Sequence, residues 1–377
     1  MKKIIVLGAS GTIGQNTIDI IRRFPDRFSL AGVSVHSKTE TLDKMRTEFG
    51  FTDFAVTEQA AAARYEKKHR SLERFLTETA ADIVVNGIAG AAGLNASLIA
   101  LKTHRILALA NKESIVMAGP LLQKEAEKYG ATIIPVDSEH SAIYNLIRAH
   151  GREHIARLIL TASGGPFRTW TRKQIQEASL EDALKHPTWN MGAKITVDSA
   201  SLANKALEVI EAVHLFDMPP DRITVAVHPS STVHSLIQLT GGEIYAQLSP
   251  PDMRNPIFAA LSYPEQPPPY LPPLDFTKVL DLHFEPPRID DFPLLELGFI
   301  AARKKAGYAI AFNAANEQAV AAFLHGQIRF VQLSEVTAQV MQEEDWSSSP
   351  TNKEDIMQLD AAARLSADKT ISRLMRN

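Results

Sequence analysis

Short apolar runs alternate with helical patterns over the first part of the chain. The helical patterns cover residues 16–23, 60–76 and 121–129, and the apolar runs cover residues 3–7, 30–35, 82–86, 105–108 and 131–136. Strands that alternate with helices in this way form parallel sheets with helices on both faces. The pattern therefore predicts an α/β protein with a parallel sheet over residues 1–150.

The rest of the chain divides into three regions of different composition. Apolar runs at 158–162 and 223–227 predict an α/β domain over residues 151–262, and the Pro-rich stretch that follows predicts an extended linker over residues 263–289. From residue 290 onward Ala, Glu, Gln, Leu and Lys dominate. Helices are expected over residues 315–324, 333–342 and 352–376, which predicts a C-terminal helical bundle over residues 290–377.

A glycine turn follows the first apolar run. It reads GASGTIG from Gly8 to Gly14, and a helical pattern comes after it. Backbone N–H groups at such a helix start can approach a pyrophosphate, so a Rossmann-like nucleotide site is favoured over a purely structural turn, although the glycine spacing is GxxGxxG. The next strand ends at His36, Ser37 and Lys38, without the acidic residue that holds the ribose of NAD. A hydroxyl and an ammonium group suit a 2′-phosphate, which favours NADPH; a solvated turn is the alternative.

Composition and charge exclude several classes of protein. The 40 Lys and Arg residues against 43 Asp and Glu residues leave a net charge of -3, which is not typical of a nucleic-acid-binding chain. The apolar run at the N-terminus ends at Gly8 and is too short for a signal peptide, and no run is long enough for a membrane span. We expect a cytoplasmic protein. The absence of cysteine excludes a thiolate nucleophile, Cys-ligated zinc and iron–sulfur clusters.

Polar clusters follow three consecutive strands, at residues 87–93, 111–114 and 137–140. Asp137 and Glu139 stand two apart and would point the same way in an extended segment. Together with Glu208 they offer three carboxylates, a set that suits Mg²⁺ or Mn²⁺. The alternative is that each acid is separately a helix cap or a surface charge.

The stretch from His186 to Glu208, HPTWNMGAKITVDSASLANKALE, is rich in polar groups and lacks the period of a buried element. A helix that begins near Ser201 would place Asn204 and Glu208 on one face, with Lys205 adjacent.

A phosphate monoester could be bound by short hydrogen-bond donors and one cation. The candidates are Ser163, which precedes a pair of glycines, and Ser199, Asn204 and Lys205 of this stretch. His186 could donate to the anion or move protons, and Trp189 could belong to a mobile lid. The alternatives are serines that form turns or caps, a structural histidine and a core tryptophan.

These residues resemble a known family. The runs GASGTIG, NKES, VDSEHSAI, SGGPFR, HPTWNMG, DSASLANKALE and FNAANEQAV occur in the same order in 1-deoxy-D-xylulose 5-phosphate reductoisomerases, and the resemblance covers nearly the whole chain. It implies an NADP-dependent oxidoreductase of isoprenoid biosynthesis. Such an enzyme rearranges 1-deoxy-D-xylulose 5-phosphate and reduces the product with NADPH to 2-C-methyl-D-erythritol 4-phosphate, with Mg²⁺ or Mn²⁺ bound. The resemblance also implies a homodimer.

The resemblance assigns roles to individual residues. Metal ligands fall on Asp137, Glu139 and Glu208. For catalysis we select Lys112, Glu139 and His186, and our hypothesis from the chemistry of the reaction is that Glu139 or its water moves the hydroxyl proton and Lys112 stabilises the oxyanion. Substrate contacts fall on Lys112, Ser138, Glu139, Ser163, His186, Trp189, Ser199, Asn204, Lys205 and Glu208. Cofactor contacts fall on Ser10, Gly11, Thr12, Ile13, Ser37, Lys38, Asn111, Glu113 and Gly192.

The chain departs from the family pattern mainly at the cofactor. The family usually has GSTGSIG at the glycine turn, and a Gly-Arg/Lys-Asn corner where this chain has His36, Ser37 and Lys38. These changes bear on cofactor affinity. The alternative enzyme is an NADP-dependent dehydrogenase of another phosphorylated sugar or hydroxy acid, which needs no metal. A non-catalytic NADP sensor would have lost at least one of the acidic residues or Lys205, and all are present.

Overall fold

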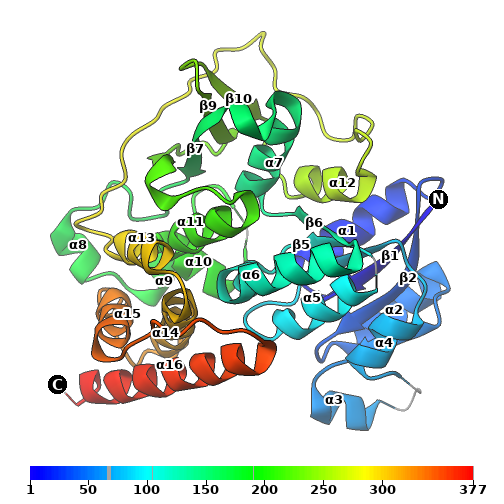
Figure 1. Ribbon diagram of the computed structural model, residues 1–377, viewed down its shortest axis with the longest axis horizontal. Helices are drawn as coiled ribbons and strands as arrows, with labels where there is room; N and C mark the ends of the chain where they lie inside the picture. The colour runs from blue at the N-terminus through cyan, green and yellow to red at the C-terminus, as the bar shows by residue number, and fades with distance from the viewer. Residues whose placement is uncertain (66–68, 104, 190, 377) are drawn as a thin grey trace. The chain divides into compact units, whose positions relative to one another are not determined.

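The computed structural model describes residues 1–65, 69–103, 105–189 and 191–376 (Figure 1). The chain forms two compact units. Unit 1 comprises Met1–Ser114, Pro120–Ser141 and Asp252–Pro272, and unit 2 comprises Ile115–Gly119, Ala142–Pro251 and Pro273–Asn377. The domain limits at residues 150, 262 and 289 stay a prediction.

The sheet of unit 1 is parallel throughout, as the alternating pattern predicted. Its strands are β1 Lys2–Leu7, β2 Phe28–Val35, β3 Asp53–Val56, β4 Ile83–Asn86, β5 Ile106–Leu109 and β6 Thr132–Pro135. Their order in the sheet is β3-β2-β1-β4-β5-β6, which is the Rossmann order. Successive strands are added on one side of β1 up to β3 and on its other side from β4 onward, so the strand order reverses between β1 and β4. Ligands of such sheets bind at this point, beyond the carboxyl ends of the strands. Ile4 and Ile5 are fully buried in the middle of this sheet, which explains the unbroken apolar run.

Helices connect these strands (Figure 1). They are α1 Thr12–Arg23, α2 Thr39–Phe49, α3 Gln59–Arg64, α4 Leu72–Glu78, α5 Gly93–Lys102 and α6 Lys112–Tyr129. Helix α7 Ser138–His150 follows the last strand of this sheet, α12 Arg254–Ser262 of unit 1 comes later in the chain, and parts of α6 and α7 belong to unit 2. The single helix predicted over residues 60–76 is wrong. Glu58 caps α3 and Ser71 caps the separate helix α4, and residues 66–68 lie outside the described part.

Unit 2 is built on a mixed sheet. Its strands are β7 Ile155–Ala162, β8 Ile223–Val227, β9 Val233–Leu239 and β10 Ile244–Leu248. Strand β7 pairs in parallel with β8 and antiparallel with β9, and β10 forms the edge. The apolar runs predicted β7 and β8. They did not reveal β9 and β10, because β10 has no fully buried residue and lacks a clear alternation.

Helices of unit 2 share one hydrophobic core with its sheet. They are α8 Arg172–Gln176, α9 Leu180–Ala183, α10 Ala193–Ala200, α11 Ala203–Phe216, α13 Leu294–Lys304, α14 Gly307–Leu324, α15 Gln332–Glu343 and α16 Lys353–Leu374, with 3₁₀ turns Arg152–His154 and Pro220–Arg222. Helices α14, α15 and α16 pack together as the predicted C-terminal bundle. Leu158 of the sheet and Phe312 of the bundle belong to the same core cluster.

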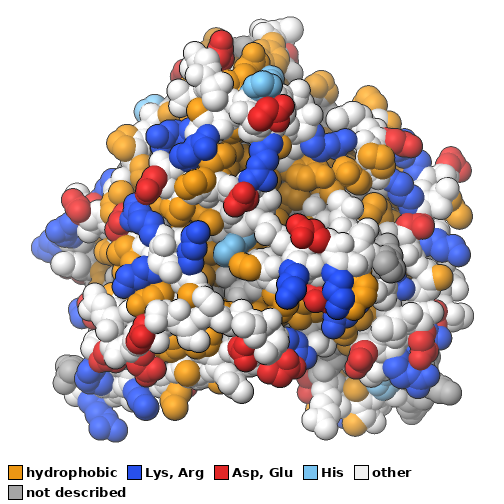
Figure 2. All heavy atoms as spheres, in the orientation of Figure 1, with side chains coloured by type: hydrophobic (Ala, Val, Ile, Leu, Met, Phe, Trp, Pro, Cys, Tyr) orange, Lys and Arg blue, Asp and Glu red, His pale blue; other side chains and the backbone are white. Residues whose placement is uncertain are grey.

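Surface charge agrees with the near-neutral composition. On the face drawn in Figure 2, Lys and Arg side chains are interspersed with Asp and Glu side chains. Within the described residues, each helix is either too short or too polar to cross a bilayer.

Candidate active site

The glycine turn of unit 1 requires glycine at two of its positions. Gly8 has φ +70°, and a Cβ there would lie 2.7 Å from the carbonyl oxygen of Gly87. A Cβ on Gly14 would lie 2.4 Å from Cα of Ala9, so glycine allows α1 to pack against the end of β1. Helix α1 begins at Thr12, four residues before the predicted start.

The N-terminus of α1 is open to a ligand. Its N-cap residue, Gly11, provides no side-chain cap, and the first turn carries no acid. Gly11 and Thr12 are exposed, and Ser10 and Ile13 are partly exposed. Exposed N–H groups at a helix start form an anion site, so these four residues lie where a pyrophosphate would need them.

The corner after β2 is also exposed. Ser37 and Lys38 directly precede α2, and Lys38 is its N-cap residue. Neighbouring His36 contacts Thr57 through Nδ1, 3.1 Å from Oγ1. The hydroxyl and ammonium groups of this corner are therefore accessible at the carboxyl end of the sheet.

Asn111 organises the loop between β5 and α6. As N-cap it accepts a hydrogen bond from Ser114 N at 3.2 Å, and its amide donates to Gly90 O at 2.9 Å and to Glu113 Oε2 at 2.8 Å. A Cβ on Gly93 would lie 2.3 Å from Asn111 Oδ1, so this glycine admits the amide.

Asn86, at the end of β4, supports the same loop. Its buried amide donates to Gly93 O at 3.0 Å and to Ser97 Oγ at 2.8 Å, while its carbonyl accepts from Ile88 N. Asn86 was not among the predicted site residues. Its position as a polar residue at the end of an otherwise apolar strand was the one sequence signal that pointed to it.

Lys112 and Asp137 form an ion pair within unit 1. Lys112 Nζ lies 2.6 Å from Asp137 Oδ2, and the two side chains are 8% and 15% exposed. Ser138 Oγ donates to Glu139 Oε2 at 2.5 Å. The predicted extended geometry of Asp137 and Glu139 is wrong, because α7 starts at Ser138, with only two residues between it and the end of β6. Glu139 therefore occupies the first turn of a helix, where the helix dipole favours a carboxylate.

Glu208 of α11 is fully buried in unit 2 and has two partners on its own helix. Asn204 Nδ2 donates to Oε1 at 2.5 Å, and Lys205 Nζ donates to Oε2. The shared face predicted for Asn204 and Glu208 is confirmed. The predicted start near Ser201 is confirmed to within two residues, since α11 begins at Ala203 after Leu202, at φ +60°. The preceding helix α10, whose C-cap residue is Ser201, was not predicted.

His186 lies between two serines of unit 2. Its Nε2 is 3.0 Å from Ser163 Oγ and 3.1 Å from Ser199 Oγ. Its Nδ1 accepts from the backbone N–H groups of Thr188 at 3.1 Å and Trp189 at 2.8 Å. Burial lowers the pKa of His186 below its usual 6.5. The ring is therefore neutral, with its proton on Nε2 facing the two hydroxyls.

Gly165 brings the two serines close to His186. It has φ +67°, and a Cβ there would lie 2.7 Å from Ser199 O. The loop that carries Ser163 can therefore rest directly on the end of α10.

The predicted lid lies between His186 and Gly192, which is the exposed N-cap residue of α10. Trp189 is partly exposed rather than fully buried, and Asn190 lies outside the described residues.

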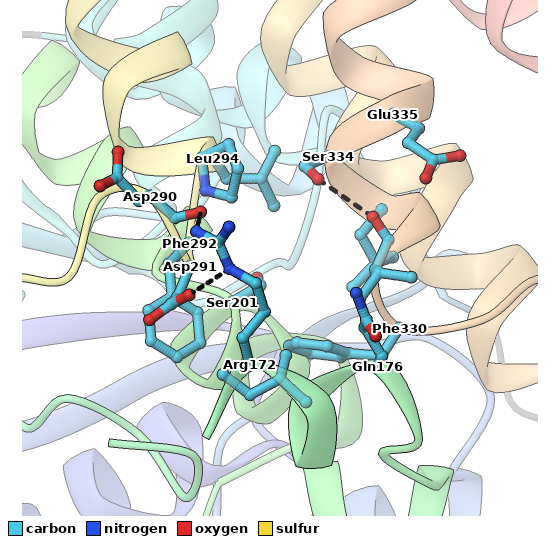
Figure 3. A pocket seen from close by; sticks show the side chains of 14 residues that line it. Arg172, Gln176, Ser201, Asp290, Asp291, Phe292, Leu294, Phe330, Ser334 and Glu335 are labelled. Atoms are coloured by element: carbon cyan, nitrogen blue, oxygen red, sulfur yellow. Dashed lines mark hydrogen bonds and ion pairs between the residues drawn. The ribbon is translucent and has the colours of Figure 1, made fainter. Parts of the chain in front are cut away.

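Two pockets of unit 2 differ in their relation to these residues. One, of about 360 Å³, borders Ser163 and Pro187 and so adjoins the site. The other, of about 200 Å³, lies between Phe292 and Phe330, and Arg172 pairs with Asp291 at its rim (Figure 3). None of the residues predicted to bind substrate, cofactor or metal lines that second pocket in the described part of the chain.

Comparison with known proteins decides the family. Profiles described as 1-deoxy-D-xylulose 5-phosphate reductoisomerase and its C-terminal domains match residues 4–119, 133–216 and 248–366. The enzyme of this name from Treponema pallidum is 54% identical over 376 residues, which cover 100% of this chain and 99% of the relative. The chain belongs to the 1-deoxy-D-xylulose 5-phosphate reductoisomerase family.

Other members of the reductoisomerase family agree in sequence and in fold. The Geobacillus kaustophilus protein is 43% identical, with 97% of this chain and 98% of the relative covered. The structure of the Zymomonas mobilis reductoisomerase in complex with NADPH has a TM-score of 0.90 at 34% identity and covers 98% of this chain and 99% of its own. A reductoisomerase structure with NADPH, fosmidomycin and magnesium has a TM-score of 0.89 at 38% identity, with 99% and 98% covered.

Proposed function

We propose that this chain converts 1-deoxy-D-xylulose 5-phosphate to 2-C-methyl-D-erythritol 4-phosphate with NADPH and a divalent cation. The observation that carries the proposal is the full-length match to reductoisomerases, combined with a complete set of the polar groups that this chemistry needs. Relatives of the same fold bind NADPH, magnesium and fosmidomycin. The reaction combines a rearrangement of the carbon skeleton with a reduction.

The residues of unit 1 fit a dinucleotide phosphate. Ser10, Gly11, Thr12 and Ile13 would hold the pyrophosphate with the open start of α1, and Ser37 with Lys38 would hold the 2′-phosphate. Asn111, Glu113 and Gly192 complete the proposed cofactor contacts.

The acidic residues fit a hard cation. Asp137, Glu139 and Glu208 offer carboxylate oxygens only, which is the donor set of Mg²⁺ and Mn²⁺. Lys112 beside Asp137 and Lys205 beside Glu208 favour the ionised, ligand-competent form of both acids. When bound, the cation would polarise the substrate's carbonyl and hydroxyl oxygens, and NADPH would supply the hydride.

The residues of unit 2 fit a phosphate monoester. In neutral His186 the protonated Nε2 is a donor and cannot accept from either neighbouring hydroxyl, so the O–H groups of Ser163 and Ser199 remain available to donate to an anion. Asn204 and Lys205 supply further N–H donors and a positive charge. Trp189 would cover the bound substrate and exclude water.

Proton transfer is assigned to groups of unit 1. Glu139 would take up or return the substrate hydroxyl proton, and Ser138 holds its carboxylate in place through a 2.5 Å hydrogen bond. Lys112, held by Asp137, would stabilise negative charge on the substrate oxygen and contact it directly.

The test follows NADPH oxidation with 1-deoxy-D-xylulose 5-phosphate before and after removal of divalent cations. We expect turnover only with Mg²⁺ or Mn²⁺ present, and inhibition by fosmidomycin. Metal-independent oxidation with a different phosphorylated sugar or hydroxy acid would instead support the alternative dehydrogenase.

The proposal includes a cytoplasmic homodimer. Strand β10 is an edge strand with exposed Ile244 and Tyr245, and the segment after the Pro-rich stretch exposes Phe276 and Val279. An exposed apolar edge favours pairing with a second chain. Sedimentation of the purified chain at the mass of a monomer, or its recovery in a membrane fraction, would contradict this part.

A further inference from the structure

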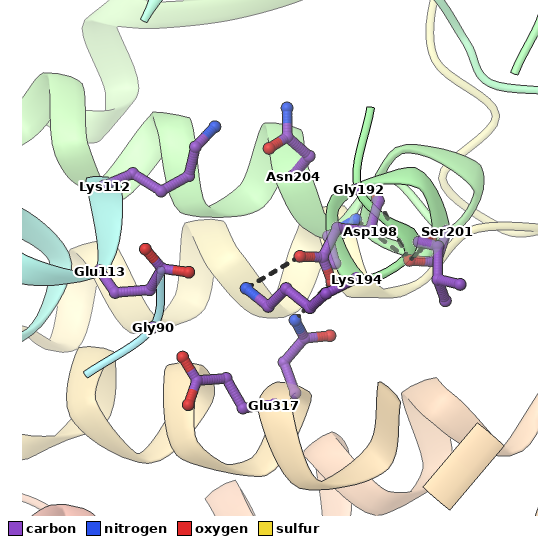
Figure 4. A network of polar contacts seen from close by, with 12 residues as sticks. Gly90, Lys112, Glu113, Gly192, Lys194, Asp198, Ser201, Asn204 and Glu317 are labelled. Atoms are coloured by element: carbon purple, nitrogen blue, oxygen red, sulfur yellow. Dashed lines mark hydrogen bonds and ion pairs between the residues drawn. The ribbon is translucent and has the colours of Figure 1, made fainter. Parts of the chain in front are cut away.

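Helix α10 contains a charge pair that opposes its own dipole. Lys194 in the first turn lies 3.0 Å from Asp198 in the last turn (Figure 4). The helix dipole favours acidic residues near the N-terminus and basic residues near the C-terminus. At a spacing of four residues, an ion pair with the basic residue first stabilises a helix less than one with the acidic residue first. The stability of α10 itself therefore does not account for the pair.

A residue of the bundle completes the arrangement. Asn316 of α14 donates from Nδ2 to Asp198 Oδ1 at 2.8 Å. Asp198 is 1% exposed and Asn316 is 0% exposed. A buried carboxylate needs both a cation and hydrogen bonds, and here Lys194 binds one oxygen while Asn316 binds the other. The three side chains thus join α10 to α14.

Stability alone does not explain this polar cluster. The carbonyl oxygen of Asn316 and both amide atoms of Asn313, one turn earlier, are buried and lack a hydrogen-bond partner within the described residues. Such unpaired groups are costly, and apolar side chains of similar size at these positions would avoid that cost. These asparagines belong to the FNAANEQAV run, for which the proposed reaction has no use.

The position of α10 suggests what the cluster does. The helix begins directly after its N-cap residue Gly192, where the predicted lid ends. Asp198 directly precedes Ser199, whose hydroxyl contacts His186. Any shift of α10 would move the end of the lid and this hydroxyl together.

We propose that Lys194, Asp198 and Asn316 form a clamp that fixes α10 to the bundle while the lid moves, so that Ser199 stays in place for the substrate phosphate. The three are positioning residues, since they act through Ser199 and the lid. The inference rests on the proposed function, because it takes Ser199 as a phosphate ligand.

The test compares four variants of the full-length chain. Asn316→Leu and Lys194→Met remove one arm of the clamp each, whereas Lys194→Arg keeps the ion pair. Gln318→Leu is the matched control, because it removes another amide-to-aspartate hydrogen bond of α14, the 2.6 Å contact to Asp368. The measurements are kcat and KM for 1-deoxy-D-xylulose 5-phosphate, fosmidomycin affinity by tryptophan fluorescence, and thermal unfolding.

We expect Asn316→Leu and Lys194→Met to raise KM and the fosmidomycin Kd about tenfold, with a smaller effect on kcat, in assays run well below the unfolding transition. Both variants should also unfold at a lower temperature, because each leaves the buried Asp198 carboxylate without one of its partners. Lys194→Arg and Gln318→Leu should behave as wild type. Wild-type affinities in both clamp variants would overturn the clamp while leaving the proposed function intact. If Asn316→Leu does not fold, Lys194→Met decides, since Lys194 is partly exposed. A wild-type chain that binds neither ligand would remove the proposed function and the clamp with it.

Discussion

The ammonium group of Lys205 donates a hydrogen bond to the carboxylate of Glu208, three residues later on α11, and the two side chains are 3% and 0% exposed. The buried carboxylate of Glu208 accepts hydrogen bonds from this ammonium group and from the amide of Asn204. The two residues thus place a carboxylate beside a cation inside unit 2, at the position proposed for a metal ligand.

Replacing Glu208 by Gln should abolish metal binding by removing this charge. We expect the Mn²⁺ affinity, measured by electron paramagnetic resonance titration, to fall at least about 100-fold, together with turnover. Glu296→Gln is the control, since Glu296 forms a surface ion pair with Arg303 and its loss should change little. Unchanged Mn²⁺ affinity in Glu208→Gln, with the fold intact, would exclude Glu208 as a ligand.

The Glu139→Gln variant tests the proton-transfer role. Glutamine keeps the shape but cannot accept the substrate proton, so turnover should be lost while the NADPH Kd stays at the wild-type value. Fluorescence of bound NADPH and steady-state rates give both numbers. Retained activity would reject the assignment.

The corner after β2 should determine cofactor choice. Lys38→Glu places a negative charge where the 2′-phosphate is proposed to bind, and we expect the NADPH Kd to rise about 10–100-fold while NADH binding changes little. Lys44→Glu makes the same charge change at another exposed lysine of α2 and should leave the preference unaltered. If Lys38→Glu weakened the binding of NADPH and NADH equally, the 2′-phosphate would not bind at this corner.

The lowered pKa of His186 predicts how substrate affinity depends on pH. Burial keeps the ring neutral at and above its usual pKa of 6.5, so KM should stay flat from about pH 7 to pH 8.5. The lowered pKa also makes the free energy of unfolding depend on pH. Above about pH 6.5 His186 is neutral in both the folded and the unfolded chain, and its full contribution to stability is present. As the pH falls towards the folded pKa this contribution is lost, because the unfolded chain takes up the proton first. A KM that rises about tenfold per pH unit above 6.5 would show that an imidazolium binds the phosphate.

Two glycines beside the lid should respond differently to the same substitution. Gly165→Ala must push its loop away from Ser199 O and hold a strained φ of +67°, so KM should rise at least about tenfold. Gly192→Ala meets no protein atom within 4 Å and has φ -65°, so the methyl group should not strain the backbone and KM for the substrate should change little. Because Gly192 is a proposed cofactor contact, an effect is expected only on the NADPH Kd. Assays of both variants under one condition check this contrast, and equal effects would contradict the packing described for Gly165.

Local patterns predicted the parts of the fold that depend on local physics. The buried run around Ile4 and the glycines from Gly8 to Gly14 identified the first strand and its turn, because burial and backbone strain leave few alternative residues. The pattern did not predict the break between α3 and α4, nor that α7 starts at Ser138. The break between α3 and α4 depends on capping by Glu58 and Ser71, and the start of α7 depends on where the backbone turns after β6. The period of hydrophobic residues contains neither kind of information.

The residues of the candidate site were easier to predict from the sequence than the contacts between residues far apart in the chain. The pairing of Asn204 with Glu208 follows from helical spacing, so it could be predicted once a helix was assumed. The contact of Asn316 with Asp198 joins residues 118 positions apart, and no local pattern contains that information. The supporting amide of Asn86 was missed for a similar reason, since its partners Gly93 and Ser97 belong to the next helix.

The most direct test of the account measures product formation from 1-deoxy-D-xylulose 5-phosphate and NADPH by the purified, metal-depleted chain before and after Mn²⁺ is restored. The account predicts no reaction before and stoichiometric conversion to 2-C-methyl-D-erythritol 4-phosphate after. Conversion at full rate without any divalent cation, or no conversion with it, would contradict the account.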